Sequence, residues 1–108
     1  MNAVSSDIRT HALIFKALGH PARLQIVTLL ADGERCVCDL TEQVGLDIST
    51  ISKHLSILVR AGVLVNERRA NKIFHRLRTP CVLKVLSCLN DVRNAPDGAG
   101  PVRASCCV

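Results

Sequence analysis

Six cysteines are the residues of this chain whose type and spacing could do chemistry. Two of them, Cys36 and Cys38, are separated by one residue, and Asp39 follows directly. Thiolates bind soft ions such as Zn(II), Cd(II) and Pb(II), and by the same chemistry trivalent arsenic and antimony. The pair is therefore a candidate site for a metal or metalloid ion. The alternative is that both side chains are small apolar residues that happen to lie close in sequence.

The spacing of the pair sets a condition on the backbone. Residues i and i+2 of an α-helix point about 200° apart around the axis, whereas in extended backbone they point to the same side. Cys36 and Cys38 can therefore share one ion only if the following helix begins late or if its first turn deforms. An ion that deforms this turn would act as a switch, because it would favour one backbone conformation over another.

The other four cysteines are candidate sources of a further ligand. Cys106 and Cys107 lie in residues 95–108, whose Pro, Gly and Ala content predicts a flexible tail. Cys81 and Cys88 share one face of a predicted helix but are separated by about 10 Å along its axis, so they cannot hold one ion as a lone pair. Buried cysteine at an interface is the favoured interpretation of these two, although either could approach Cys36 or Cys38 across the fold.

Length and composition narrow the class of protein. A chain of 108 residues, of which 48% are hydrophobic, predicts one domain, which we place at residues 1–94. Aromatic residues make up 2% of the chain, which disfavours base stacking on single-stranded nucleic acid. We see neither an apolar run that could span a membrane nor a signal peptide, so we expect a cytoplasmic protein with no membrane partner. Thiols in that compartment point to metal or redox chemistry.

The positive charge is concentrated in one quarter of the chain. The net charge is +5, and residues 53–78 carry seven basic residues against one acidic residue, Glu67. Such a patch favours contact with nucleic-acid phosphates. A solvated face without a partner is the alternative.

Periodicity and capping residues predict five helices and one β-hairpin. The helices are expected at about residues 6–18, 21–31, 39–44, 48–61 and 80–94. The strands are expected at 63–65 and 73–77, joined by a basic tip at 68–72. A short helix, a glycine turn, a longer helix and a basic hairpin follow one another in this order in a winged helix-turn-helix, a mainly α fold with a β-hairpin wing.

The fourth predicted helix has an apolar and a polar face. Ile51, Leu55 and Leu58 should face the core, and His54 is expected to be structural. The residues predicted to contact DNA bases and phosphates on this helix and at the hairpin tip are Ser49, Thr50, Ser52, Lys53, Ser56, Arg60, Arg68, Arg69 and Lys72. An enzyme is disfavoured, because local sequence gives none of the four histidines a recognisable nucleophile or orienting partner.

Four blocks of sequence, at residues 17–24, 36–40, 49–55 and 58–64, resemble the ArsR/SmtB family of metal-responsive repressors. The resemblance covers about residues 8–92. It implies a homodimer, formed through the first and last helices, that represses transcription by binding double-stranded operator DNA. It also implies an inducer that weakens DNA binding. Arsenite or antimonite bound to Cys36 and Cys38 is the favoured inducer, and an organoarsenical is another candidate inducer.

The sequence departs from the family pattern in its ligands. Arsenic-sensing relatives often carry a third cysteine where Thr41 stands here. Lead and cadmium sensors take further cysteines from an N-terminal arm, but residues 1–35 contain none. Zinc sensors use Asp and His on the last helix, where Asp91 stands alone. A third ligand would then come from Cys81, Cys88, Cys106 or Cys107. A redox- or persulfide-responsive repressor, which would pair Cys36 or Cys38 with Cys81 or Cys88, and a Cd-, Pb- or Zn-responsive repressor remain alternatives.

Overall fold

The fold is known from a computed structural model that describes residues 5–94. The predicted tail at 95–108, with Cys106 and Cys107, lies outside these residues. Over the described range, no helix is long and apolar enough to cross a membrane.

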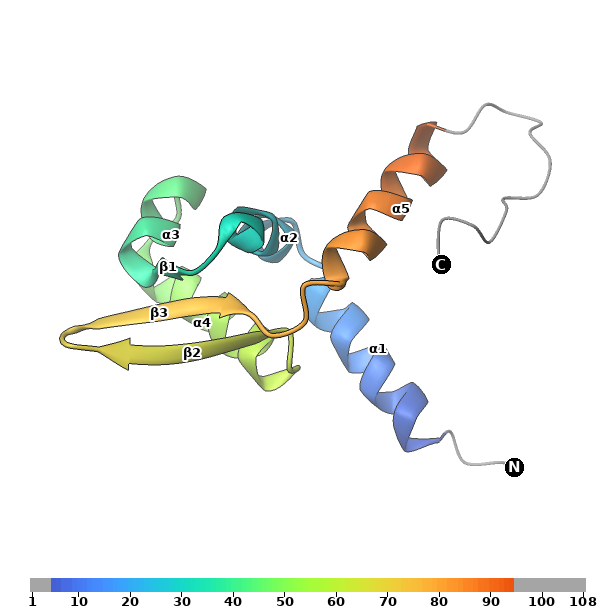
Figure 1. The fold of residues 1–108 in the computed structure, drawn as a ribbon, viewed down its shortest axis with the longest axis horizontal. Helices are drawn as coiled ribbons and strands as arrows, with labels where there is room; N and C mark the ends of the chain where they lie inside the picture. Colours follow the sequence, from blue (N-terminus) through green and yellow to red (C-terminus); the bar gives the residue numbers. More distant parts are fainter. Residues whose placement is uncertain (1–4, 95–108) are drawn as a thin grey trace.

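Five α-helices and a three-stranded antiparallel sheet make up the described fold. Their order is α1 (Ser6–Leu18), α2 (Pro21–Leu29), β1 (Arg35–Cys36), α3 (Val37–Val44), α4 (Ile48–Arg60), β2 (Leu64–Arg69), β3 (Lys72–Leu77) and α5 (Val82–Asn94), with a 3₁₀ turn at Leu30–Asp32. Figure 1 shows α2, α3 and α4 gathered beside the sheet. Helices α1 and α5 extend to one side of this body, and the β2–β3 hairpin extends to the other. The winged helix-turn-helix predicted from the sequence is confirmed.

Local capping signals set most helix boundaries. The Asp47 carboxylate accepts a hydrogen bond from the backbone N–H of Thr50 at 3.1 Å and starts α4. Pro21 opens α2, where the proline ring suits the first helical position. Gly45 adopts a left-handed conformation with φ of 81° and ends α3. These signals explain why the predicted helices lie close to the observed ones.

The apolar face of α4 forms the centre of the core. Ile51, Leu55 and Leu58 are at most 2% exposed, as their helical spacing predicts. They pack in one cluster with Ile26 of α2 and Leu40 of α3, both fully buried. Helix α4 is therefore fixed on the body of the domain, and its opposite face stays available.

The sheet contains a third strand that the sequence did not predict. The strand order is β1-β3-β2, and Arg35 and Cys36 pair with His75 and Phe74 of β3. A strand of two residues has no alternation of apolar and polar positions, so only the partner strand defines it. The hairpin strands are also longer than predicted and include the basic residues Arg68, Arg69 and Lys72.

The turn of the hairpin offers a test of the fold. Ala70 has a φ of 54°, the one positive φ of a non-glycine residue in the range that the structure covers. It is the first residue of a two-residue hairpin turn, where glycine is preferred. We expect Ala70→Gly to raise the free energy of unfolding by about 0.5–1 kcal/mol, since it relieves backbone strain. Urea denaturation measures this change. Ala61→Gly, at the right-handed end of α4, is the matched control and should lower stability; a loss of stability in Ala70→Gly would contradict the turn.

Two buried imidazoles predict an acid-sensitive fold. Burial lowers the pKa of His75 and, together with the nearby His20 and Arg23, that of His54. In the folded chain both side chains therefore stay neutral to a lower pH than in the unfolded chain, whose histidines take up protons below about pH 6.5. The contribution of these two imidazoles to the free energy of unfolding is then fully present above that pH and is lost as the pH falls below it.

We expect the free energy of unfolding, measured in urea, to decrease from pH 7.5 to pH 5.5. Arg23 Nε donates a hydrogen bond to His54 Nδ1 at 3.1 Å. His54→Asn, whose side-chain oxygen can still accept this bond, should reduce the pH dependence. His11→Gln, a change at an exposed position of α1, should leave it unchanged. Equal stability of the wild type at both pH values would contradict this expectation.

Candidate thiol centre and nucleic-acid interface

The backbone brings the Cys36 and Cys38 thiols together. Cys36 is extended, with φ of −79° and ψ of 160°, because it ends β1 and caps α3. Cys38 lies in the first turn of the helix, and the two Sγ atoms are 2.7 Å apart. The helix begins at Val37, two residues earlier than predicted, but still after Cys36. The prediction that a shared ion needs a late helix start or a deformed first turn is therefore wrong, because an extended Cys36 beside a helical Cys38 already brings the two sulfurs together.

The two thiols differ in acidity. Cys36 has a pKa below its usual value because it accepts hydrogen bonds, first from the Cys38 thiol and then from the Asp39 backbone N–H, with a smaller contribution from the Lys72 charge. The pKa of Cys38 is raised, chiefly because its proton is donated to Cys36. Cys36 is therefore the more acidic of the two thiols.

A third ligand does not join this pair within residues 5–94, where no group of three His, Cys, Asp or Glu side chains is placed to hold an ion. Cys81 precedes α5 and Cys88 lies on it. Figure 1 shows α5 and α3 on opposite sides of the domain. Thr41, at the place of a third cysteine in arsenic-sensing relatives, donates its hydroxyl proton to the Val37 carbonyl at 2.8 Å. The Cys36 and Cys38 side chains are thiols, not a disulfide.

The polar face of α4 is open. Ser52, Lys53, Ser56 and Arg60 are exposed, as predicted for a helix that contacts DNA. At the start of the helix, the hydroxyls of Ser49 and Thr50 donate hydrogen bonds to Asp47. These bonds hold the pKa of Asp47 well below its usual value. Ser49 and Thr50 therefore support the cap and can still accept hydrogen bonds through their remaining lone pairs.

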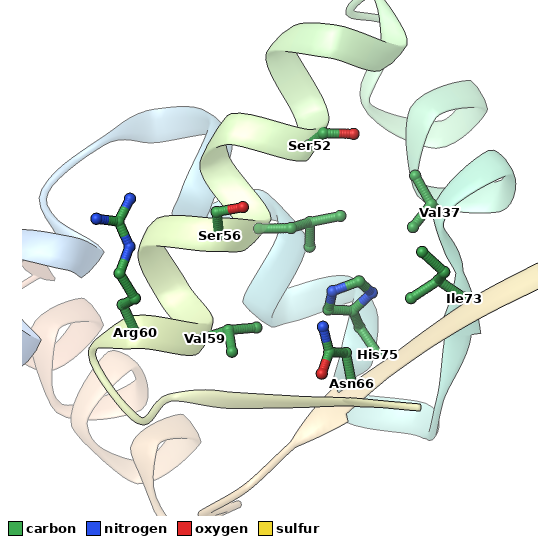
Figure 2. A pocket seen from close by; sticks show the side chains of 9 residues that line it. Val37, Ser52, Ser56, Val59, Arg60, Asn66, Ile73 and His75 are labelled. Atoms are coloured by element: carbon green, nitrogen blue, oxygen red, sulfur yellow. The ribbon is translucent and has the colours of Figure 1, made fainter. Parts of the chain in front are cut away.

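A groove of about 310 Å³ separates α4 from the sheet. Figure 2 shows Ser52 and Ser56 on the helix facing His75 and Asn66 of the hairpin. Val37, the residue between the two cysteines, lines the same groove. Val37 is thus next in sequence to both thiols and also lines the groove beside α4.

The basic residues of the hairpin divide between two environments. Arg68 and Lys72 are exposed, and the charge of Lys72 acts on both thiols. The guanidinium of Arg69 instead binds Glu34 through two hydrogen bonds, of 2.5 and 2.8 Å. Its Nε donates to Glu67 at 2.6 Å. These contacts raise the pKa of Arg69, with Glu34 the larger cause.

Sequence reasoning missed Glu34 and Glu67 as partners of Arg69. Glu67 is two residues before Arg69 on one strand, so alternation could have placed the two side chains on the same face. No local signal identifies Glu34, because its approach depends on the pairing of β1 with β3.

Comparison with known sequences gives the family. Residues 20–66 match the profile of the arsR family of bacterial regulatory proteins. An HTH-type transcriptional regulator of Mycobacterium tuberculosis is 38% identical over 77 residues, which cover 70% of this chain and 68% of that protein. The biofilm growth-associated repressor of Agrobacterium fabrum is 34% identical over 86 residues, or 80% and 74% of the two chains. An arsenic resistance transcriptional regulator of Pseudomonas putida is 38% identical over 72 residues, or 66% and 56%.

Solved structures agree with the sequence matches. A crystal structure of a Mycobacterium tuberculosis protein has a TM-score of 0.72 and 33% identity, and the match covers 83% of this chain and 91% of that one. The solution structure of a homodimeric winged helix-turn-helix DNA-binding domain from Mycobacterium bovis has a TM-score of 0.74 and 25% identity, over 94% and 100% of the two chains. The chain is therefore a winged helix-turn-helix regulator of transcription, not an enzyme, and it belongs to the ArsR family of bacterial regulatory proteins.

Proposed function

We propose that the protein is a cytoplasmic repressor that binds operator DNA as a homodimer and is released by trivalent arsenic or antimony on Cys36 and Cys38. The observation that carries this proposal is the 2.7 Å approach of the two thiols at the start of the helix-turn-helix. Among the relatives, the arsenic resistance regulator of Pseudomonas putida supports the choice of ion.

The exposed face of α4 supports DNA binding. A recognition helix presents its N-terminal half to base edges in the major groove. Ser52, Lys53 and Ser56 supply hydrogen-bond donors on short or flexible side chains there. Arg60 supplies a positive charge that can contact a phosphate of the DNA backbone. Arg68 and Lys72, at the end of the hairpin, extend this positive surface to phosphates beyond the groove.

Apolar residues on α1 and α5 support a dimer. Phe15 and Val92 are each 63% exposed, and Leu89 is 54% exposed. No side chain of α5 is buried in the single chain, although a helix of this length needs a packed face to be stable. A second copy that covers these faces would supply that packing, and the Mycobacterium bovis neighbour is homodimeric. Two copies would bring two α4 helices to successive half-sites.

The chemistry of the ion fits a pair of thiols. Arsenite condenses with two thiols, forming two As–S bonds and releasing two molecules of water, while arsenic keeps one hydroxyl. A third thiol, from Cys81, Cys88, Cys106 or Cys107, could replace that hydroxyl. A monomethylated trivalent arsenical needs only two thiols, because its methyl group fills the third position. The pair alone therefore satisfies the organic form.

Ion binding would act on the start of α3. Arsenic bonded to both sulfurs replaces the hydrogen bond between the two thiols with two As–S bonds of fixed length. The Cys36 sulfur also accepts the Asp39 N–H at 3.4 Å, so the helix cap is altered as well. Movement of Val37 would reach the groove beside α4. The ion thus binds one conformation better than the DNA-binding one, which is what release requires.

A first test removes the thiols. In fluorescence anisotropy with DNA selected in vitro from a random library, arsenite and methylarsenite should each weaken binding of the wild type by about tenfold or more. The variant with Cys36→Ser and Cys38→Ser should bind DNA as the wild type does, with neither arsenical changing its affinity. Normal release in this double variant would show that the thiol site is wrong.

The single variants Cys81→Ser and Cys88→Ser identify a further ligand. If either supplies it, that variant loses its response to arsenite but keeps its response to methylarsenite. Cd(II) and a persulfide serve as parallel additions. A response to either of these, with none to the arsenicals, would favour the corresponding alternative sensor.

A second test concerns the dimer. Leu89→Glu places a charge in the apolar face of α5, so we expect the dissociation constant of the dimer to rise by about tenfold or more in sedimentation equilibrium. Asn90→Glu adds the same charge at the next, exposed position and should leave the dimer intact. Dimers of equal stability in both variants would place the interface elsewhere.

A further inference from the structure

Arg69, one of the basic residues predicted to contact DNA, already forms hydrogen bonds to two carboxylates of the protein. The end of the Arg69 guanidinium meets both oxygens of Glu34, and its Nε side meets Glu67. The guanidinium also lies 5.0 Å from the centre of the Phe74 ring. Both hydrogen-bonding edges that could grip a phosphate are therefore in use.

The sheet register explains this arrangement. Phe74 of β3 pairs with Cys36 of β1 on one side and with Glu67 of β2 on the other. Directly paired residues place their side chains on the same face, and alternate residues of a strand do the same. Arg69 therefore shares its face with Cys36, whereas Arg68 lies on the opposite face. Glu34 precedes β1 on the side away from the hairpin tip, so the Arg69 side chain extends back past Glu67 and over the Phe74 ring to reach it.

We propose that Glu34 competes with the DNA backbone for Arg69, and so acts as a positioning residue that sets how strongly the hairpin holds phosphate. A carboxylate and a phosphate present the same pair of oxygens to a guanidinium, so they bind Arg69 as alternatives. Arg69 held by Glu34 contributes no phosphate contact. Arg69 released from Glu34 contributes one in each subunit.

The exposure of the ion pair makes this exchange feasible. The side chains of Arg69 and Glu34 are 46% and 35% exposed. Exposed ion pairs are weak and screened by salt, even where their geometry is good. A DNA phosphate held close by the recognition helix can therefore displace Glu34 without disrupting the core.

The position of Glu34 also connects this competition to the thiols, an extension that rests on the proposed function. Glu34 directly precedes β1, the strand that ends at Cys36 and is paired with β3. An ion on Cys36 and Cys38 that favours the Glu34-bound state of Arg69 would remove a phosphate contact. Loss of the Arg69–phosphate contact would then account for part of the fall in DNA affinity when the ion binds.

The test compares two acids in the absence of any arsenical. Glu34→Gln frees Arg69, whereas Glu42→Gln removes the same charge from an exposed position of α3. We expect Glu34→Gln to bind the selected DNA about three- to fivefold more tightly than the wild type at low salt. Its plot of log affinity against log salt should steepen by about 0.9 for each additional phosphate that the protein neutralises. Glu42→Gln should change the affinity less and leave the slope as it is.

A double-variant cycle assigns the effect to Arg69. In an Arg69→Gln background, Glu34→Gln should no longer tighten binding or steepen the salt dependence beyond the change that Glu42→Gln causes. Equal effects of the two acidic variants, or tighter binding that persists without Arg69, would overturn the proposal.

Adding methylarsenite to the same proteins tests the extension. Glu34→Gln should lose less affinity on addition than the wild type does, while thiol titration shows equal ion binding. An equal loss in both proteins would overturn the link to the thiols. A wild type that binds no arsenical contradicts the proposed function instead, and leaves the competition for Arg69 to be decided by the ligand-free measurements.

Discussion

The pairing of two residues, Arg35 and Cys36, with strand β3 is the interaction on which the functional geometry depends. It holds Cys36 extended, so that α3 begins at the next residue and the two thiols meet. Arg35 reinforces the segment from the other face: its Nε donates to the Leu29 carbonyl at 2.9 Å, and its Nη1 to Asp39 at 2.7 Å. The same pairing brings Glu34 to Arg69. Without it, the thiols, the hairpin and the start of the helix-turn-helix would be independent of one another.

The parts of the fold that could be predicted are those that local chemistry determines. Asp47, Pro21 and Gly45 mark helix ends through hydrogen bonding or backbone preference within a few residues. The buried face of α4 follows from the spacing of Ile51, Leu55 and Leu58. The overall order of elements could be predicted for the same reason.

The parts that escaped prediction depend on contacts between distant residues. Strand β1 has no pattern of its own, and its existence follows from an edge of β3 that is available for pairing. The ion pair of Glu34 and Arg69 spans 35 positions in sequence, so no helical or strand spacing indicates it. For the thiols, helical spacing led us to expect a late helix start or a deformed first turn, and it did not anticipate that pairing of β1 would hold Cys36 extended beside a helical Cys38.

A preformed thiol pair changes how a switch at this site would work. If the thiols had to be brought together, ion binding would draw the backbone into a new shape. Here the sulfurs already face each other, so binding would act through the hydrogen bonds of the Cys36 sulfur, which caps α3 and would bond to the ion instead. Release of DNA then depends on how far this disturbance reaches through Val37 to the groove beside α4, and along β1 to Glu34.

The central claim, that the thiol pair and the DNA surface are two linked sites, is tested most directly by measuring arsenical affinity with and without DNA. Methylarsenite binding is titrated on the free protein and on its complex with the selected DNA, at one salt concentration. Linkage requires that DNA weaken methylarsenite binding by the same factor by which methylarsenite weakens DNA binding. We predict such an equal and reciprocal loss of about tenfold or more. Equal affinities for methylarsenite in the free and DNA-bound states would contradict the account.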